Sequence, residues 1–228
     1  MKLRSASLIS TLAVAAVSAE AALSPYTANG IDLVYSSVSG ATWTRDANLF
    51  NTLADADSSL VSQIIALTPT LADDHFGLVS LSAADFTPST GWMTWWGAKA
   101  FTNYLNHVAY GGSTAWTLPT TAGNEMSELF FDELGGSIGL PRPSSPSFTH
   151  VPAYTNWLQE QHPSSAQYAW NFGNFGTQQV EYKYQHYAAL VISPGLVAAV
   201  PEASAWASLL AGLGVLGLRA RRTRRCSL

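Results

Sequence analysis

The stretch from Gly91 to Gly136 constrains the fold most, because it combines a dense run of aromatic residues with clear helix and turn signals. Its first half predicts an amphipathic helix with Thr94 as N-cap, which stops at Gly111 and Gly112. Residues 116–119 then predict a short extended segment that ends in a proline. Four of the chain's eight tryptophans lie in this stretch: Trp92, Trp95, Trp96 and Trp116.

A second helix is predicted after the extended segment. Thr120 and Thr121 can accept hydrogen bonds from free amides at its start. Gly135-Gly136 offers the left-handed residue that ends many helices. The apolar stripe of this helix consists of Met126, Leu129, Phe130 and Leu134. The whole stretch therefore predicts a helix, a turn, a short extended segment and a helix.

The segment before Gly91 predicts two strands and one helix. Strands over residues 31–35 and 41–44 are joined by a Ser-rich turn, and a helix over residues 53–67 ends at Pro69. No clear period follows, so the charged spot at residues 73–75, Asp-Asp-His, is predicted to lie in a solvated loop.

The segment after the second helix predicts a long ordered loop and then strands. Residues 135–168 are rich in Pro, Ser and Gly, and the prolines exclude long helices and central strands. A hairpin over residues 168–172 and 178–184 and a final strand over residues 187–192 complete an antiparallel sheet.

The order of these motifs resembles a known family. The run Trp116-Thr117-Leu118-Pro119-Thr120, placed between a Trp- and Ala-rich helix and a helix ending in Leu-Gly, is similar to the domain at the C-terminus of Lcl-type bacterial collagen-like adhesins. Residues 42–48, Thr-Trp-Thr-Arg-Asp-Ala-Asn, match the opening of that domain. The resemblance covers roughly residues 30 to 192. It implies an α+β, C-type-lectin-like fold with two or three helices on an antiparallel sheet, whose first and last strands pair.

The N-terminal end predicts a secretory signal helix over residues 1–22. Lys2 and Arg4 precede an apolar run over residues 8–17, and small residues suited to signal peptidase follow. An uncleaved anchor helix is the alternative, but the run is shorter than the about 20 residues that a membrane span needs.

The C-terminal end, residues 198–228, predicts a sorting signal with a transmembrane helix. Val200-Pro201-Glu202 precedes an apolar stretch over residues 203–218, which would span about 24 Å as a helix. A basic cluster follows, and the positive-inside rule keeps it in the cytoplasm. The cluster comprises Arg219, Arg221, Arg222, Arg224 and Arg225.

This C-terminal arrangement resembles the PEP-CTERM sorting signal of Gram-negative bacteria, with Ala203 where the third letter is usually proline. The resemblance implies an exosortase-type sorting enzyme as partner, in species that make exopolysaccharide. It further implies export across the inner membrane, a membrane-anchored precursor, and a final place at the cell surface or outside the cell. The secreted domain would then be residues 23–197. An ordinary tail anchor is the alternative.

Charge and cysteine content narrow the function of the secreted part. Residues 23–200 carry four basic residues against thirteen acidic ones, a formal balance of −9. Nucleic acids and polyanionic glycans are disfavoured as partners, because their binding relies on clustered Lys and Arg. The only cysteine, Cys226, lies beyond the arginine cluster, so no disulfide can form within the secreted part.

Metal and enzyme chemistry find little support. The calcium-loop pattern of alternating oxygen ligands with a fixed glycine is absent, so calcium is not supported by a motif and no cofactor is predicted. Asp46 and Asn48 are expected to close a loop onto backbone amides, with a ligand or calcium contact as the alternative. The secreted part contains no hydrolase, metalloprotease or phosphate-loop motif and no cysteine nucleophile, which argues against an enzyme.

A binding or adhesion module associated with exopolysaccharide remains, and a non-binding structural matrix protein is the alternative. In lectin-like folds a long variable loop often carries the binding face, so the resemblance points to residues of the loop over 135–168. Aromatic rings suit sugar faces, and a neutral polysaccharide fits the acidic charge. The candidate ligand-binding residues are His150, Tyr154, Asn156 and Trp157.

Overall fold

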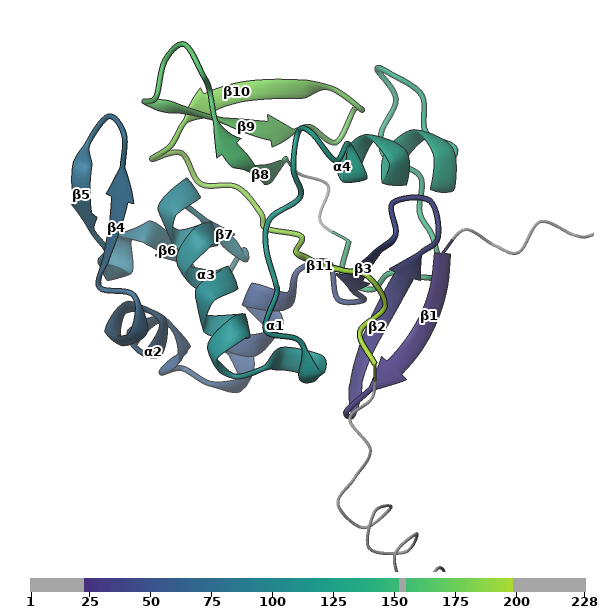
Figure 1. Ribbon diagram of the computed structural model, residues 1–228, viewed down its shortest axis with the longest axis horizontal. Coiled ribbons are helices and arrows are strands. Elements are labelled where there is room, and N and C mark those ends of the chain that lie inside the picture. The colour runs from purple at the N-terminus through teal and green to yellow at the C-terminus, as the bar shows by residue number, and fades with distance from the viewer. Residues whose placement is uncertain (1–22, 152–154, 199–228) are drawn as a thin grey trace, which may run out of the picture.

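Two antiparallel sheets dominate the computed structural model, which describes residues 23–151 and 155–198 (Figure 1). The first sheet has the order β1-β2-β3-β11 and the second has the order β10-β9-β8. Figure 1 shows the first sheet at the lower right, the second at the top, and helices α1 to α3 on the opposite side from β1. The first sheet comprises β1 (Leu23–Ala28), β2 (Ile31–Ser36), β3 (Ala41–Thr44) and β11 (Ile192–Pro194), and the second comprises β8 (Asn156–Gln161), β9 (Tyr168–Phe172) and β10 (Gln178–Tyr182).

Four α-helices and two small hairpins complete the described part of the chain. The α+β class predicted from the sequence is confirmed. The remaining elements are α1 (Leu49–Ala56), α2 (Leu60–Leu67), β4 (Thr70–Asp73), β5 (Gly77–Ser80), η1 (Ala83–Asp85), β6 (Phe86–Thr87), β7 (Trp92–Met93), α3 (Trp95–His107), η2 (Tyr110–Gly112), α4 (Glu125–Glu128) and the π-helical turn η3 (Leu129–Glu133).

Helix α3 forms where the sequence predicts it. The Thr94 hydroxyl accepts a hydrogen bond from the amide of Gly97 at 3.1 Å, so Thr94 is the N-cap. The helix ends where Ala109 adopts a left-handed conformation with φ +48°. Most of its side chains are buried, including Trp96 and Phe101.

The core consists of two apolar clusters. One gathers around α3 and includes Leu33, Phe101 and Trp157, and the other includes Trp43 and Phe130. Trp43, Trp96, Phe101, Trp116 and Phe130 are buried, whereas Tyr104 and Trp170 are half-buried, although all seven lie on apolar faces predicted from the sequence.

The single helix predicted over residues 53–67 is two helices, α1 and α2. The break lies at Asp57, whose carboxylate accepts hydrogen bonds from the amide and the hydroxyl of Ser59. Such a local turn competes with helical hydrogen bonding. The prediction of one helix was wrong because the apolar spacing continues on both sides of the break.

The charged spot at residues 73–75 is a solvated loop only in part. Asp74 and His75 are exposed in the turn between β4 and β5, whereas Asp73, the last residue of β4, is buried. The prediction was wrong for Asp73 because a sequence period cannot reveal a distant partner, here Lys183.

The region over residues 135–168 contains a strand, β8, in addition to loop. β8 lies at an edge of its sheet, and Pro146 and Pro163 fall outside it, so the proline argument against a central strand still holds.

The prediction that the first and last strands pair was wrong. β11 pairs with β3, whereas β1 occupies the opposite edge of the sheet. The segment after β11 still reaches the first strand, since the Tyr26 hydroxyl donates to the carbonyl of Val197 at 3.1 Å.

The predicted signal peptide, transmembrane helix and sorting residues lie outside the described residues. Over residues 23–151 and 155–198, no helix has both the length and the apolar character that a membrane crossing needs. The sorting residues concerned are Val200, Pro201, Glu202, Arg219, Arg221 and Arg222.

Candidate ligand-binding groove

A groove of about 260 Å³ is lined by residues of β7, of the β9–β10 turn, of β10 and of the segments before β8 and after β10. Its walls combine three aromatic with four neutral polar side chains, and no charged residue lines it. Phe175 is 50% exposed, while Trp92 and Tyr187 are half-buried with part of each ring accessible. The lining residues are Trp92, Thr155, Gly173, Asn174, Phe175, Thr177, Gln179 and Tyr187.

The β9–β10 turn that carries one wall is closely constrained. The amide of Gly173 donates to the carbonyl of Thr177 at 2.7 Å, which closes the turn. Gly176 has φ +73°, a conformation that glycine adopts without strain. A Cβ atom on Gly176 would lie 2.6 Å from the ring of Phe130, so the turn also needs glycine for space.

A neighbouring loop braces the outside of this turn. The amide of Gly139 donates to the carbonyl of Phe175 at 3.0 Å, and the amide of Arg142 donates to the carbonyl of Asn174 at 2.8 Å. Two hydrogen bonds from separate residues fix the backbone on which Asn174 and Phe175 stand. The groove wall is therefore ordered before any ligand arrives.

Tyr187 belongs to another wall, and Trp157 supports it. Tyr187 and Met93 exchange backbone hydrogen bonds of 2.9 and 3.0 Å. The Trp157 ring meets the Tyr187 ring edge to face, with centroids 5.0 Å apart, and its indole N–H donates to the carbonyl of Met93 at 2.9 Å. Burial and the charge of Glu181 raise the pKa of Tyr187. A tyrosine hydroxyl is protonated at neutral pH in any case, so this one is able to donate a hydrogen bond.

None of the basic residues of the described chain lines the groove. Lys183 is fully buried in an ion pair with Asp73, and Arg45 lies 3.4 Å from Asp32. Lys99 and Arg142 are half-buried, and burial lowers the pKa of both. The groove thus offers aromatic faces and neutral hydrogen-bonding groups, without a cation to attract an anionic ligand.

The predicted ligand-binding residues do not meet in an exposed site. Trp157 is fully buried beneath Tyr187, and Asn156 is 1% exposed in the same strand. A sugar cannot stack on Trp157, because its indole ring is fully buried in the core. The side chain of His150 is exposed, but its Nδ1 lies 3.0 Å from Asp46. Tyr154 lies outside the described residues.

Asp46 closes a loop, as the sequence led us to expect. Its carboxylate accepts from the amide of Asn48 at 2.9 Å and from the hydroxyl of Thr52 at 2.5 Å. Within the described residues there is no group of three or more His, Cys, Asp or Glu side chains able to hold a metal ion.

The other polar cluster is the buried ion pair between Asp73 and Lys183, 2.5 Å apart. Asp73 also accepts from the Trp96 indole at 2.8 Å and from two backbone amides. The Lys183 ammonium donates to Gln161 at 2.8 Å and lies 4.5 Å from the centre of the Trp95 ring. Both side chains of the pair are sealed from solvent, so we assign it a structural role.

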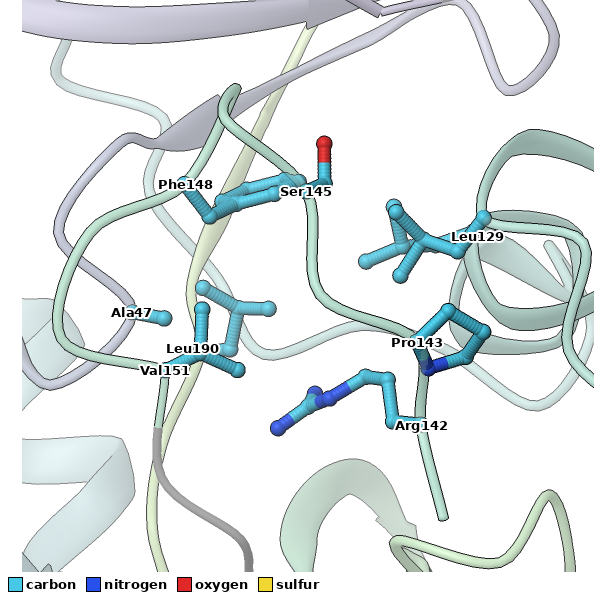
Figure 2. A pocket seen from close by; sticks show the side chains of 9 residues that line it. Ala47, Leu129, Arg142, Pro143, Ser145, Phe148, Val151 and Leu190 are labelled. Atoms are coloured by element: carbon cyan, nitrogen blue, oxygen red, sulfur yellow. The ribbon is translucent and has the colours of Figure 1, made fainter. Parts of the chain in front are cut away.

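A second hollow, shown in Figure 2, is too small for a ligand. Its volume is about 10 Å³, about enough for one water molecule. Leu129, Phe148 and Leu190 surround it, and Arg142 reaches in beside Pro143 (Figure 2). This hollow is a packing gap beside the loop and not a binding site.

The sequence held one signal for the groove. Gly173-Asn174-Phe175-Gly176 places an aromatic residue and an amide at the tip of a predicted hairpin, where side chains are exposed. Trp92 and Tyr187 carried no such signal, because only the tertiary pairing of β7 with the segment after β10 brings them to the turn.

Comparisons of the chain with protein-family models, with curated proteins and with solved structures give no match.

Proposed function

We propose that the chain is an exported cell-surface or extracellular-matrix protein whose secreted domain is a binding or adhesion module for a neutral polysaccharide. The groove between Trp92, Phe175 and Tyr187 carries this proposal. Aromatic rings pack against the apolar faces of sugar rings, and amides and hydroxyls bond their hydroxyl groups. A groove with both kinds of group and no charge suits an uncharged sugar polymer.

The charge distribution supports the same choice. The described part of the chain is strongly acidic, and its few basic side chains are buried, half-buried or paired. Sulfated or otherwise anionic glycans need a basic surface, and acidic neighbours repel them. We also propose that the α+β architecture is a C-type-lectin-like arrangement, supported by the return of β11 to the N-terminal sheet.

Replacing Phe175 or Gln179 with alanine should weaken binding to a neutral polysaccharide about tenfold, because each removes an exposed groove contact. Both side chains are exposed, so the fold should persist. Binding would be measured by calorimetry with neutral and sulfated polymers, at about 0.05 and 0.5 M salt. Tyr184→Ala is the matched control, since Tyr184 is 52% exposed and lies outside the groove.

Tight, salt-sensitive binding of the sulfated polymer, unchanged by both groove variants, would contradict a neutral-ligand site. Failure of every polymer to bind would instead favour the non-binding matrix protein.

Processing of the C-terminal end provides a separate expectation. We propose that an exosortase-type enzyme removes the segment after Pro201-Glu202, so that the secreted protein lacks the arginine cluster. Mass spectrometry of protein from the extracellular fraction would measure this directly. Secreted protein that still contains Arg225 would rule out processing, and unchanged localisation after deletion of residues 201–228 would rule out a sorting role.

A further inference from the structure

Three large apolar side chains stand exposed beside the groove. Ile138 is 72% exposed, Leu140 is 61% exposed and Phe175 is 50% exposed. The hydrogen bond from the Gly139 amide to the Phe175 carbonyl, 3.0 Å long, joins the loop of Ile138 and Leu140 to the groove wall. We refer to Ile138, Leu140 and Phe175 as the apolar shelf.

The backbone holds the apolar shelf in place. Gly139 has φ +82°, and the Leu140 amide donates to the carbonyl of Ser137 at 3.1 Å, so the loop makes a tight turn between its two apolar residues. The next backbone hydrogen bond, from Arg142 to Asn174, fixes the far end of the loop. Single exposed apolar residues are ordinary, but a braced group continuous with a groove is typical of a contact surface.

Because Phe175 belongs to both the shelf and the groove, one ligand can cover both. The groove side offers the amides of Asn174 and Gln179, which can donate to a carbonyl oxygen. The shelf side offers only aliphatic and aromatic carbon at the tips of its side chains. These groups suit an uncharged ligand that carries small apolar groups next to hydrogen-bond acceptors.

Resting on the proposed function, we propose that the ligand is a neutral polysaccharide that carries acyl esters, such as O-acetyl groups. The sugar ring lies in the groove against Tyr187, and the ester carbonyl accepts from a groove amide. The acetyl methyl group packs on the apolar shelf. The shelf thus distinguishes acylated from bare polymer, while the groove recognises the sugar backbone.

The test uses acetylated glucomannan oligosaccharides before and after mild alkaline deacetylation, because both forms are neutral. The full-length protein should bind the acetylated form about tenfold more tightly than the deacetylated form. This is the expected effect of burying one or two methyl groups. The double variant Ile138→Ser with Leu140→Ser should lose this difference and keep the weaker affinity for the deacetylated form. The matched control is Leu78→Ser, which alters a side chain that is 69% exposed on β5 and away from the groove.

Equal affinity of the wild-type protein for both forms, reduced in each case by Gln179→Ala, would overturn the inference and leave the proposed function standing. No binding of either form, or binding that Gln179→Ala leaves unchanged, would overturn both. Binding to phosphatidylcholine vesicles that the double serine variant abolishes would overturn the inference in favour of a membrane contact. Sedimentation that shows a dimer lost in the same variant would overturn it in favour of a second copy of the chain.

Discussion

Replacing Lys183 with methionine should lower the free energy of unfolding by about 3–5 kcal/mol. Lys183 and Asp73 are both fully buried at the side chain, and the substitution leaves a carboxylate without its counter-charge in the protein interior. Chemical denaturation at neutral pH measures the loss. The double variant Lys183→Met with Asp73→Leu should recover much of the stability, because an apolar pair of similar volume avoids the cost of burying charge.

The pH dependence of stability gives a second view of the same pair. Burial raises the pKa of Asp73, but the Lys183 ammonium and three N–H donors outweigh it and lower the pKa from 3.8 to about 2. A lowered carboxyl pKa contributes stability above the unfolded value, and that contribution is lost as the pH falls through the folded value. About 2 kcal/mol should therefore disappear between about pH 4 and pH 2. Asp73→Asn should remove this part of the acid dependence.

Lys99→Met is the matched control for both measurements. The Lys99 ammonium lies 4.4 Å from the centre of the Trp95 ring, close to the distance of Lys183, but Lys99 is half-buried, and no carboxylate of the described residues forms an ion pair with it. Its loss should cost less than about 1 kcal/mol. An equal loss in the Lys99 and Lys183 variants would contradict the role given to the buried pair.

Replacing Trp116 with alanine should also cost about 3–5 kcal/mol. The indole is 2% exposed and donates to the carbonyl of Tyr110 at 2.9 Å. Its backbone is bound on both sides by the Asn106 amide, which ties the extended segment to α3. Removal of the indole leaves a cavity in the core cluster around α3, because the helix and strand backbones prevent the neighbouring side chains from filling it.

Thermal unfolding of Trp116→Ala would be compared with that of Trp170→Ala, a half-buried indole on β9. The Trp170 variant should lose clearly less stability, because solvent already reaches part of its ring. A Trp116 variant that melts like the parent would contradict its place in the core.

The structure of this chain is predictable from its sequence where one local signal determines the backbone conformation. The Thr94 cap and the hairpin across residues 173–176 each depend on residues close in sequence, and both are confirmed. The predicted stop at Gly111 and Gly112 is wrong, because α3 already ends at His107, before the left-handed Ala109. The end of the second predicted helix also follows, since Gly135 has φ +66° and the Gly136 amide donates to the carbonyl of Phe130. Caps and turns impose backbone conformations that few other residues tolerate.

The position of a side chain is not predictable from the sequence where it depends on a partner far away in the chain. Asp73 looks like a surface residue until Lys183, 110 positions away, reaches it in the core. Trp157 has the character of an exposed sugar-stacking residue, but β8 turns it inward against Met93 and Tyr187. Trp157 lies beneath Tyr187, which lines the groove, and apart from Thr155 the side chains that line the groove come from segments outside the predicted loop.

The pairing of β11 with β3 has a mechanical consequence. In Figure 1 the described segment after β11 ends beside the lower part of the first sheet, whereas the β9–β10 hairpin lies at the top. For a chain held at its C-terminal end, the groove would point away from the anchor. Tension between a bound polymer and the anchor would then cross the whole domain and leave it through β11, which meets β3 at three residue pairs. The lifetime of the attachment under tension would depend on the stability of that short strand as well as on the affinity of the groove for the polymer.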